Sequence, residues 1–269
     1  MNSKNNTLID KKLYIFDMDG TIYLGNHVFD FAVSFIKKLR KSGRRVLFFT
    51  NNASHNYNFY INKLSKMGFE PSADEILSSA DVTINFLKNH RNGKKVYLVG
   101  TPELHKMFSD CGISMASDDG EADIVVSSFD TTLTYRKLEC ACRYIQNGAE
   151  YLCTHPDFNC PTENGAIPDS GAIAAMIIAA TGVTPKYFGK PYADTLNTIC
   201  EYTGIDKRDM CIFGDRLYTD IAFGKNHGVL SVLVYTGETS PDDVANAPEN
   251  SKPDIALNSL LDAERIIFG

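Results

Sequence analysis

Short apolar segments alternate along this chain with longer segments in which the apolar residues recur at the spacing of a helix. The segments KLYIFD and RRVLFFT have the composition of strands, and each is followed by an amphipathic stretch that ends at a glycine, Gly43 and Gly68 respectively. Strands that alternate with helices in this way form parallel sheets with both faces covered. The sequence therefore predicts an α/β protein with a Rossmann-like, three-layer α/β/α core.

The same alternation returns near the end of the chain, where PKYFG, DMCIFGD and SVLVYTG are strand-like. Between these segments and the N-terminal ones lies a second alternating block of about 90 residues, the size of a small domain. One continuous sheet is the alternative. For a chain of 269 residues, we expect instead a discontinuous core, residues 1–90 and 185–269, with an inserted α/β domain over residues 91–184.

Composition narrows the choice of partners and compartment. The formal net charge of −6 argues against a nucleic-acid-binding surface. The longest apolar stretch, residues 171–183, is too short to span a membrane, and the N-terminal residues lack the apolar core of a secretory signal. The seven cysteines are irregularly spaced, as reduced thiols are in proteins of the cytoplasm. We therefore expect a cytoplasmic protein that binds neither nucleic acid nor membrane.

Acidic residues follow two of the strand-like segments. Asp17 and Asp19 come directly after KLYIF, and CIFGDRLYTD places Asp215 and Asp220 after another apolar run. Taken alone, Asp-x-Asp-Gly is equally well explained as a turn. Because the carboxyl ends of parallel strands meet at one edge of a sheet, we expect Asp17, Asp19 and Asp215 to converge there. Carboxylates this close repel one another unless a cation lies among them, and all-oxygen ligands favour Mg²⁺.

Two further segments suit a phosphate group. FFTNNAS ends a strand at Thr50, followed by Asn51 and Asn52. The hydroxyl of Thr50 and the backbone amides of this segment can bind phosphate oxygens. YFGKP places Lys190 at the end of another strand, either as a solvated tip or as a cation that stabilises a transferring phosphoryl group. With Mg²⁺ and this lysine present, Asp17 is placed to attack phosphorus, and Asp19 to protonate the leaving oxygen and later activate water.

The motifs DMDGT, TNN, GKP and GDRLYTDI, in that order, resemble those of the haloacid dehalogenase (HAD) superfamily of phosphatases. The insert between TNN and GKP is similar to the subclass IIA cap of the NagD-like and p-nitrophenyl phosphatase group. Within the insert, the segment THPDFNCPTENGAIPDSGAI also resembles a segment of that cap. The resemblance covers essentially the whole chain. It implies a HAD core with an α/β cap, and Mg²⁺-dependent hydrolysis of small phosphomonoesters through an aspartyl-phosphate.

The resemblance also implies roles for individual residues. Asp17 is the expected nucleophile and Asp19 the expected general acid and base. The magnesium ion is expected to bind the carboxylates of Asp17 and Asp215 and the backbone carbonyl of Asp19. The phosphoryl group is expected to bind Thr50 and Lys190, with Asn51 and Asn52 nearby. Asp220 is expected to orient the metal ligands or Lys190 rather than to bind the metal.

Two positions depart from the family pattern, and both lie in the expected cap. His155 stands where the family has Asn, and Asp169 stands where it has Gly. In this group the cap faces the leaving group, so His155 and Asp157 are candidates for substrate contacts, with a purely structural histidine as the alternative. Members of the group often pair through the cap, which implies a homodimer.

Other readings of the same residues lead to different functions. A phosphotransferase or phosphomutase of the same superfamily shares the first half-reaction. A non-enzymatic phospho-acceptor also uses an acidic cluster, but it is about half as long, and a base at Asp19 would shorten the life of its phospho-aspartate. A P-loop protein is excluded because FGKP has proline after the lysine. The expected substrate is a small phosphorylated metabolite, such as a sugar phosphate or nucleoside monophosphate, or p-nitrophenyl phosphate.

Overall fold

The computed structural model describes residues 7–162 and 165–269, and the chain divides into two compact units. The core unit comprises Met1–Thr50, Tyr60–Leu77 and Lys190–Gly269, and the inserted unit comprises Asn51–Phe59 and Ser78–Gly189. The inserted unit therefore begins earlier and ends later than the block 91–184 expected from the sequence. Whether it acts as a cap stays a prediction.

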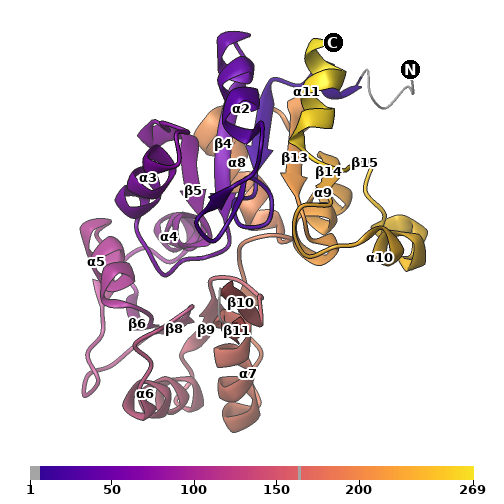
Figure 1. Cartoon of the computed structure of the whole chain (residues 1–269). Helices are drawn as coiled ribbons and strands as arrows, with labels where there is room; N and C mark the ends of the chain where they lie inside the picture. The colour runs from indigo at the N-terminus through magenta and orange to yellow at the C-terminus, as the bar shows by residue number, and fades with distance from the viewer. Residues whose placement is uncertain (1–6, 163–164) are drawn as a thin grey trace. The chain divides into compact units, whose positions relative to one another are not determined.

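The core unit is built on a six-stranded sheet in the order β15-β14-β13-β1-β4-β5. The central strand β1 pairs in parallel with β4 and β13, and β14 pairs in parallel with β13 and β15. This order brings the ends of β1, β4 and β13 side by side (Figure 1). The strands are β1 Leu13–Phe16, β4 Arg45–Thr50, β5 Ile76–Ser78, β13 Met210–Gly214, β14 Leu230–Val234 and β15 Ile255–Leu257.

Helices cover the sheet of the core unit, which is why its strands are apolar on both faces. Tyr14 and Phe16 of β1 belong to one buried cluster with Phe35 of α2 and Leu260 of α11, while the alternate residue Ile15 is equally buried. The α/β prediction with a parallel sheet is confirmed. The helices are α2 Ala32–Lys41, α3 Tyr57–Lys66, α8 Ala193–Thr203, α9 Ala222–His227, α10 Pro241–Asn246 and α11 Leu260–Phe268, with a π-helical turn at Leu217–Ile221.

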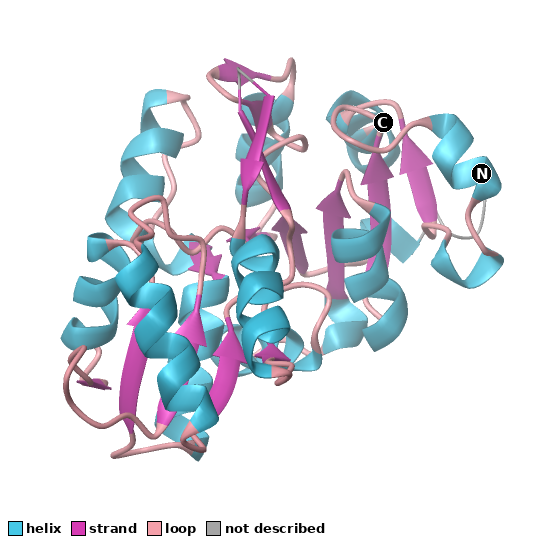
Figure 2. Cartoon of the chain, turned by 90° about the horizontal axis from the view of Figure 1, so that it is seen from below, coloured by secondary structure: helices cyan, strands magenta, loops and turns pink. Residues whose placement is uncertain are grey.

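The inserted unit has its own five-stranded sheet in the order β12-β9-β8-β6-β7 and a separate hairpin, β10 with β11. Figure 2 shows the strands of the whole chain in magenta and the helices in cyan. The strands are β6 Lys95–Val99, β7 Ser114–Met115, β8 Ile124–Ser127, β9 Glu150–Cys153, β10 Asn159–Thr162, β11 Gly165–Pro168 and β12 Lys186–Tyr187. The helices are α4 Ser79–His90, α5 Pro102–Asp110, α6 Tyr135–Gln146 and α7 Ser170–Thr181.

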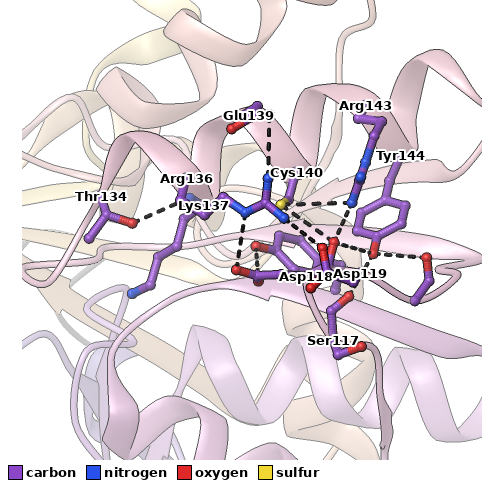
Figure 3. Close-up of polar contacts among 12 residues, drawn as sticks. Ser117, Asp118, Asp119, Thr134, Arg136, Lys137, Glu139, Cys140, Arg143 and Tyr144 are labelled. Carbon is purple, nitrogen blue, oxygen red and sulfur yellow. Dashed lines mark hydrogen bonds and ion pairs between the residues drawn. The ribbon is translucent and has the colours of Figure 1, made fainter.

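A polar network on α6 holds the loop between β7 and β8 (Figure 3). The Tyr144 hydroxyl donates to the carbonyl of Ser117 at 2.6 Å, and Arg136 pairs with Asp119 at 2.8 Å. Cys140 is buried in the same network, and all seven cysteines are free thiols. Over the described ranges 7–162 and 165–269, no helix has both the length and the apolar character that a membrane crossing requires.

Candidate active site at the carboxyl edge of the core sheet

The acidic motif after β1 turns tightly against the end of β13. The backbone N–H of Asp17 donates to the carbonyl of Phe213 at 2.9 Å, which extends the parallel pairing by one residue. Gly20 then adopts a φ of 82°. A Cβ at this position would lie 2.4 Å from Oδ2 of Asp215, so only glycine allows the backbone to pass so close to that carboxylate.

The two carboxyl groups that follow β13 are held in different ways. Asp215 Oδ2 accepts the backbone N–H of Glu238 at 2.7 Å, whereas its Oδ1 is buried and has no hydrogen-bond partner among the described residues. Asp220 belongs to the π-helical turn and crosses over Gly214, where a Cβ would lie 2.1 Å from the carboxyl carbon of Asp220. The close approach brings both carboxylates to the edge where β1 ends.

Lys190 links the carboxylates of Asp17 and Asp220. Its side chain is buried, with 1% of the residue exposed, so it is no solvated tip. The Nζ atom donates to Asp17 Oδ1 at 2.6 Å, to Asp220 Oδ1 at 2.7 Å and to the carbonyl of Phe49 at 3.3 Å. A buried ammonium with this many acceptors is stable only as an ion pair. Lys190 therefore neutralises part of the acidic cluster.

The charges of the cluster shift one another's pKa values. Burial raises the pKa of Asp17 well above its usual value, Lys190 works against this, and Asp220 and Asp215 add to it. Burial and the neighbouring Asp220 raise the pKa of Asp215 to about 6. Burial alone would lower the pKa of Lys190, but Asp17 and Asp220 outweigh it and raise that pKa above its usual value. Without a further cation, the acidic groups outnumber the single lysine.

The donor set fits a magnesium ion. One oxygen each of Asp17, Asp215 and Asp220 lies within 4.8 Å of the others, and Asp215 Oδ1 is left without a hydrogen-bond donor among the residues the structure describes. A buried carboxylate oxygen with no donor is costly unless it binds a cation. The cluster contains only carboxylate oxygens, the ligands that Mg²⁺ prefers to nitrogen and sulfur.

Asp19 lies beside the cluster and has its own partner. The Tyr23 hydroxyl donates to Asp19 Oδ2 at 3.1 Å, and the ammonium of Lys63 lies 4.0 Å from the centre of the Tyr23 ring. Burial raises the pKa of Asp19, and Lys63, Tyr23 and Arg216 offset part of that rise. Sequence reasoning missed Tyr23, although it stands only two positions after the DMDGT motif and four after Asp19.

The TNN motif is divided between the two units. Thr50 ends β4 in the core unit and is buried, whereas Asn51 and Asn52 belong to the inserted unit. There, the side-chain amide of Asn51 donates to Asp157 Oδ2 at 2.7 Å. Asn52 Oδ1 accepts the backbone N–H of Ser54 at 2.9 Å, which stabilises a local turn. The two asparagines thus contact residues of the inserted unit, including the candidate residue Asp157.

The two departures from the family pattern contact each other inside the inserted unit. His155 is fully buried, and its Nε2 lies 2.8 Å from Asp169 Oδ1. The other ring nitrogen lies 2.9 Å from Thr154 Oγ1 and 3.3 Å from Ser79 Oγ. Asp169 also caps the first turn of α7. The sequence gives no sign of this pairing, because the two residues stand 14 positions apart.

Comparisons with known proteins agree on one family. Residues 14–114 match a family described as haloacid dehalogenase-like hydrolase, and residues 187–263 match a HAD-hydrolase-like family. An acid sugar phosphatase of Staphylococcus aureus is 33% identical over 252 residues, covering 94% of this chain and 96% of the relative.

Solved structures give the same result. A 4-nitrophenylphosphatase from Thermotoga maritima is 38% identical with a TM-score of 0.92, covering 97% of this chain and 99% of the other. A p-nitrophenyl phosphatase from Archaeoglobus fulgidus is 30% identical with a TM-score of 0.88, covering 95% and 99%. A Mycobacterium tuberculosis glycerol phosphate phosphatase, in complex with magnesium, is 26% identical with a TM-score of 0.88, covering 97% and 77%.

Proposed function

The chain belongs to the haloacid dehalogenase-like hydrolases, within the NagD-like phosphatases of subclass IIA, and we propose that Asp17, Asp19 and Lys190 carry out its hydrolysis of phosphomonoesters. The observation that carries this proposal is the position of the Lys190 ammonium, 2.6 Å from Asp17 and 2.7 Å from Asp220. A buried cation beside a carboxylate at the end of a parallel strand suits a transferring phosphoryl group.

In the first half-reaction, an oxygen of Asp17 attacks phosphorus and the bond from phosphorus to the leaving oxygen breaks. Asp19 gives its proton to that oxygen, so the leaving group departs as a neutral alcohol or phenol. Burial raises the pKa of Asp19, which favours the protonated form needed at this step. The product on the enzyme is an aspartyl-phosphate at Asp17.

In the second half-reaction, Asp19, now deprotonated, takes a proton from water. The water oxygen attacks phosphorus, the bond to Asp17 breaks, and inorganic phosphate leaves with both residues restored. Lys190 binds the phosphoryl oxygens in both steps, and Asp220 holds the lysine in place at 2.7 Å. Thr50, at the end of β4, is the proposed hydroxyl donor to the same oxygens, with Asn51 and Asn52 following it.

HAD phosphatases generally depend on a metal, and we propose Mg²⁺ for this chain. The carboxylates of Asp17 and Asp215 and the backbone carbonyl of Asp19 would hold it. When bound, the ion supplies positive charge to the phosphoryl group. The support from this structure is the buried, unpartnered Oδ1 of Asp215 among the described residues.

The relatives narrow the proposed substrates to small phosphomonoesters, because they are named as phosphatases of sugar phosphates, p-nitrophenyl phosphate and glycerol phosphate. We propose sugar phosphates as the first class to test. The inserted unit is the proposed cap, in which His155 and Asp157 influence the choice of leaving group. A cytoplasmic location and a homodimer formed through the cap remain further proposals.

The test is phosphate release from a panel of sugar phosphates, nucleoside monophosphates and p-nitrophenyl phosphate, with Mg²⁺ and with EDTA. We expect release with Mg²⁺, none with EDTA, and none from Asp17→Asn under either condition. Asp30→Asn changes an exposed aspartate of the same unit and is the matched control. Near-normal turnover by Asp17→Asn would exclude Asp17 as the nucleophile.

A further inference from the structure

The short hairpin after the acidic motif brings a buried tyrosine back to that motif. Strand β2, Tyr23–Leu24, pairs with β3, His27–Val28. The backbone carbonyl of Tyr23 accepts the N–H of Gly20 at 2.8 Å, and its side chain is fully buried. Both the backbone and the ring of Tyr23 are therefore fixed against the loop that carries Asp19.

The only side chain that donates a hydrogen bond to Asp19, among the described residues, is Tyr23, at 3.1 Å from Oδ2. The end torsion of an aspartate side chain is broad and roughly two-fold, so a free carboxyl group exposes either oxygen. A single donor at Oδ2 removes this freedom. It leaves Oδ1 as the oxygen that can hold a proton for transfer.

A third residue holds the tyrosine ring. Lys63, on α3, places its ammonium 4.0 Å from the ring centre. A cation at this distance over an aromatic face is attracted to the negative face of the ring. The hairpin, the ring and the lysine thus form a support for the Asp19 carboxyl group within the core unit.

We propose that Tyr23 is a positioning residue for Asp19: its hydroxyl holds Oδ2, so that Oδ1 is the oxygen that exchanges the proton with the leaving group and then with water. The inference rests on the proposed role of Asp19 as general acid and base. Tyr23 neither gains nor loses a proton in this scheme. Its effect is to keep the donated proton in line with the oxygen that needs it.

Proton donation matters most when the leaving group is a poor one. Phenyl phosphate releases a much weaker acid than p-nitrophenyl phosphate does, so its cleavage depends more on Asp19. The value of kcat/KM includes only the steps up to formation of the aspartyl-phosphate, and it therefore isolates this donation. For Tyr23→Phe we expect kcat/KM to fall about tenfold with phenyl phosphate and less than about threefold with p-nitrophenyl phosphate.

Two further variants separate loss of the support around Asp19 from a general effect of removing a buried tyrosine hydroxyl. Lys63→Met keeps the length of the side chain and removes the charge, and we expect a smaller loss with the same preference for p-nitrophenyl phosphate. Tyr14→Phe is the matched control, because Tyr14 is also buried but donates to the carbonyl of Leu8 at 2.7 Å. We expect this control to lower both rates equally or not at all.

The experiment measures kcat/KM for a series of substituted phenyl phosphates with wild type, Asp19→Asn and the three variants, alongside thermal unfolding of each. A steeper dependence on leaving-group acidity in Asp19→Asn and Tyr23→Phe supports the inference. An unchanged dependence in Asp19→Asn overturns the proposed acid role of Asp19. A steeper dependence in Asp19→Asn together with a wild-type dependence in Tyr23→Phe overturns the positioning role alone.

Discussion

Lys190 is a cation with 1% of its surface exposed, and its charge balances carboxylates from two separate segments. A lysine in this position differs from a surface lysine, because it is desolvated and already oriented before a substrate arrives. Preorganised donors of this kind stabilise transition states by on the order of 3 kcal/mol each. In the proposed role, we expect Lys190 to act on the rate more than on substrate affinity.

For Lys190→Met we expect kcat/KM to fall by about 10²-fold or more, since the variant loses the ammonium but retains most of the side-chain volume. Steady-state phosphate release with Mg²⁺ measures the effect. Lys38→Met is the control, because Lys38 is exposed and its ion pair with Glu264 lies on the surface. A Lys190→Met rate within about threefold of wild type would contradict the proposed role.

At the scale of elements, an aspartate joins the edge of the core sheet to a helix. Asp254, just before β15, accepts the backbone N–H and the hydroxyl of Ser231 on β14, at 3.1 and 2.8 Å, and pairs with Lys225 of α9 at 3.0 Å. Burial tends to raise the pKa of Asp254, but the donors at Ser231 and Lys225 outweigh it and lower that pKa. The ionised form is therefore bound more tightly in the folded state.

For Asp254→Asn we expect the free energy of unfolding at pH 7 to fall by about 1–2 kcal/mol, because charged hydrogen bonds are lost. A lowered folded pKa stabilises the protein above the unfolded value, and this contribution disappears as the pH falls through the folded value. The difference between wild type and variant should thus be present at pH 5 to 7 and shrink below the usual aspartate value of 3.8.

Urea unfolding at pH 7, 5 and 3 measures this difference, with Asp30→Asn as a control at an exposed aspartate. A difference that stays constant down to pH 3 would show that the charge of Asp254 does not contribute.

At the scale of the whole molecule, the proposed metal ligands all belong to the core unit. An ion that binds only the folded state stabilises it by about 2.7 kcal/mol at a hundred times its dissociation constant. We therefore expect Mg²⁺ to raise the Tm of the transition that unfolds the core unit, and EDTA to lower it. Asp215→Asn should remove this response, as calorimetry with and without Mg²⁺ can measure. An equal rise in the variant would place the ion elsewhere.

The sequence was most informative where chemistry sits at the ends of strands. Asp17 and Asp215 were predictable as neighbours, because each follows an apolar strand of the same parallel sheet and such ends share an edge. Lys190 follows β12, which pairs with β9 in the inserted sheet rather than with a core strand, so the shared edge does not explain its contact with Asp17. The contact of Tyr23 with Asp19 was not predictable, because it depends on how a short hairpin folds back. The contact between His155 and Asp169 was hidden as well, since it depends on where α7 begins.

The domain boundaries were harder to predict from the sequence than the fold class. The inserted unit takes in Asn51–Phe59 and begins again at Ser78, in the middle of an alternating pattern that shows no change in composition. A boundary of this kind depends on which partner each helix packs against, and periodicity carries no information on that choice.

The pairing of β1 with β13, Leu13 opposite Met210, has a consequence for synthesis on the ribosome. One edge of β1 can pair only after β13 has been synthesised, nearly 200 residues later. Until then one edge of this apolar strand has no partner, whereas every strand of the inserted unit has already emerged from the ribosome. Chain growth thus favours completion of the insert first, and the nascent core is the part of the molecule most exposed to chaperones and to aggregation.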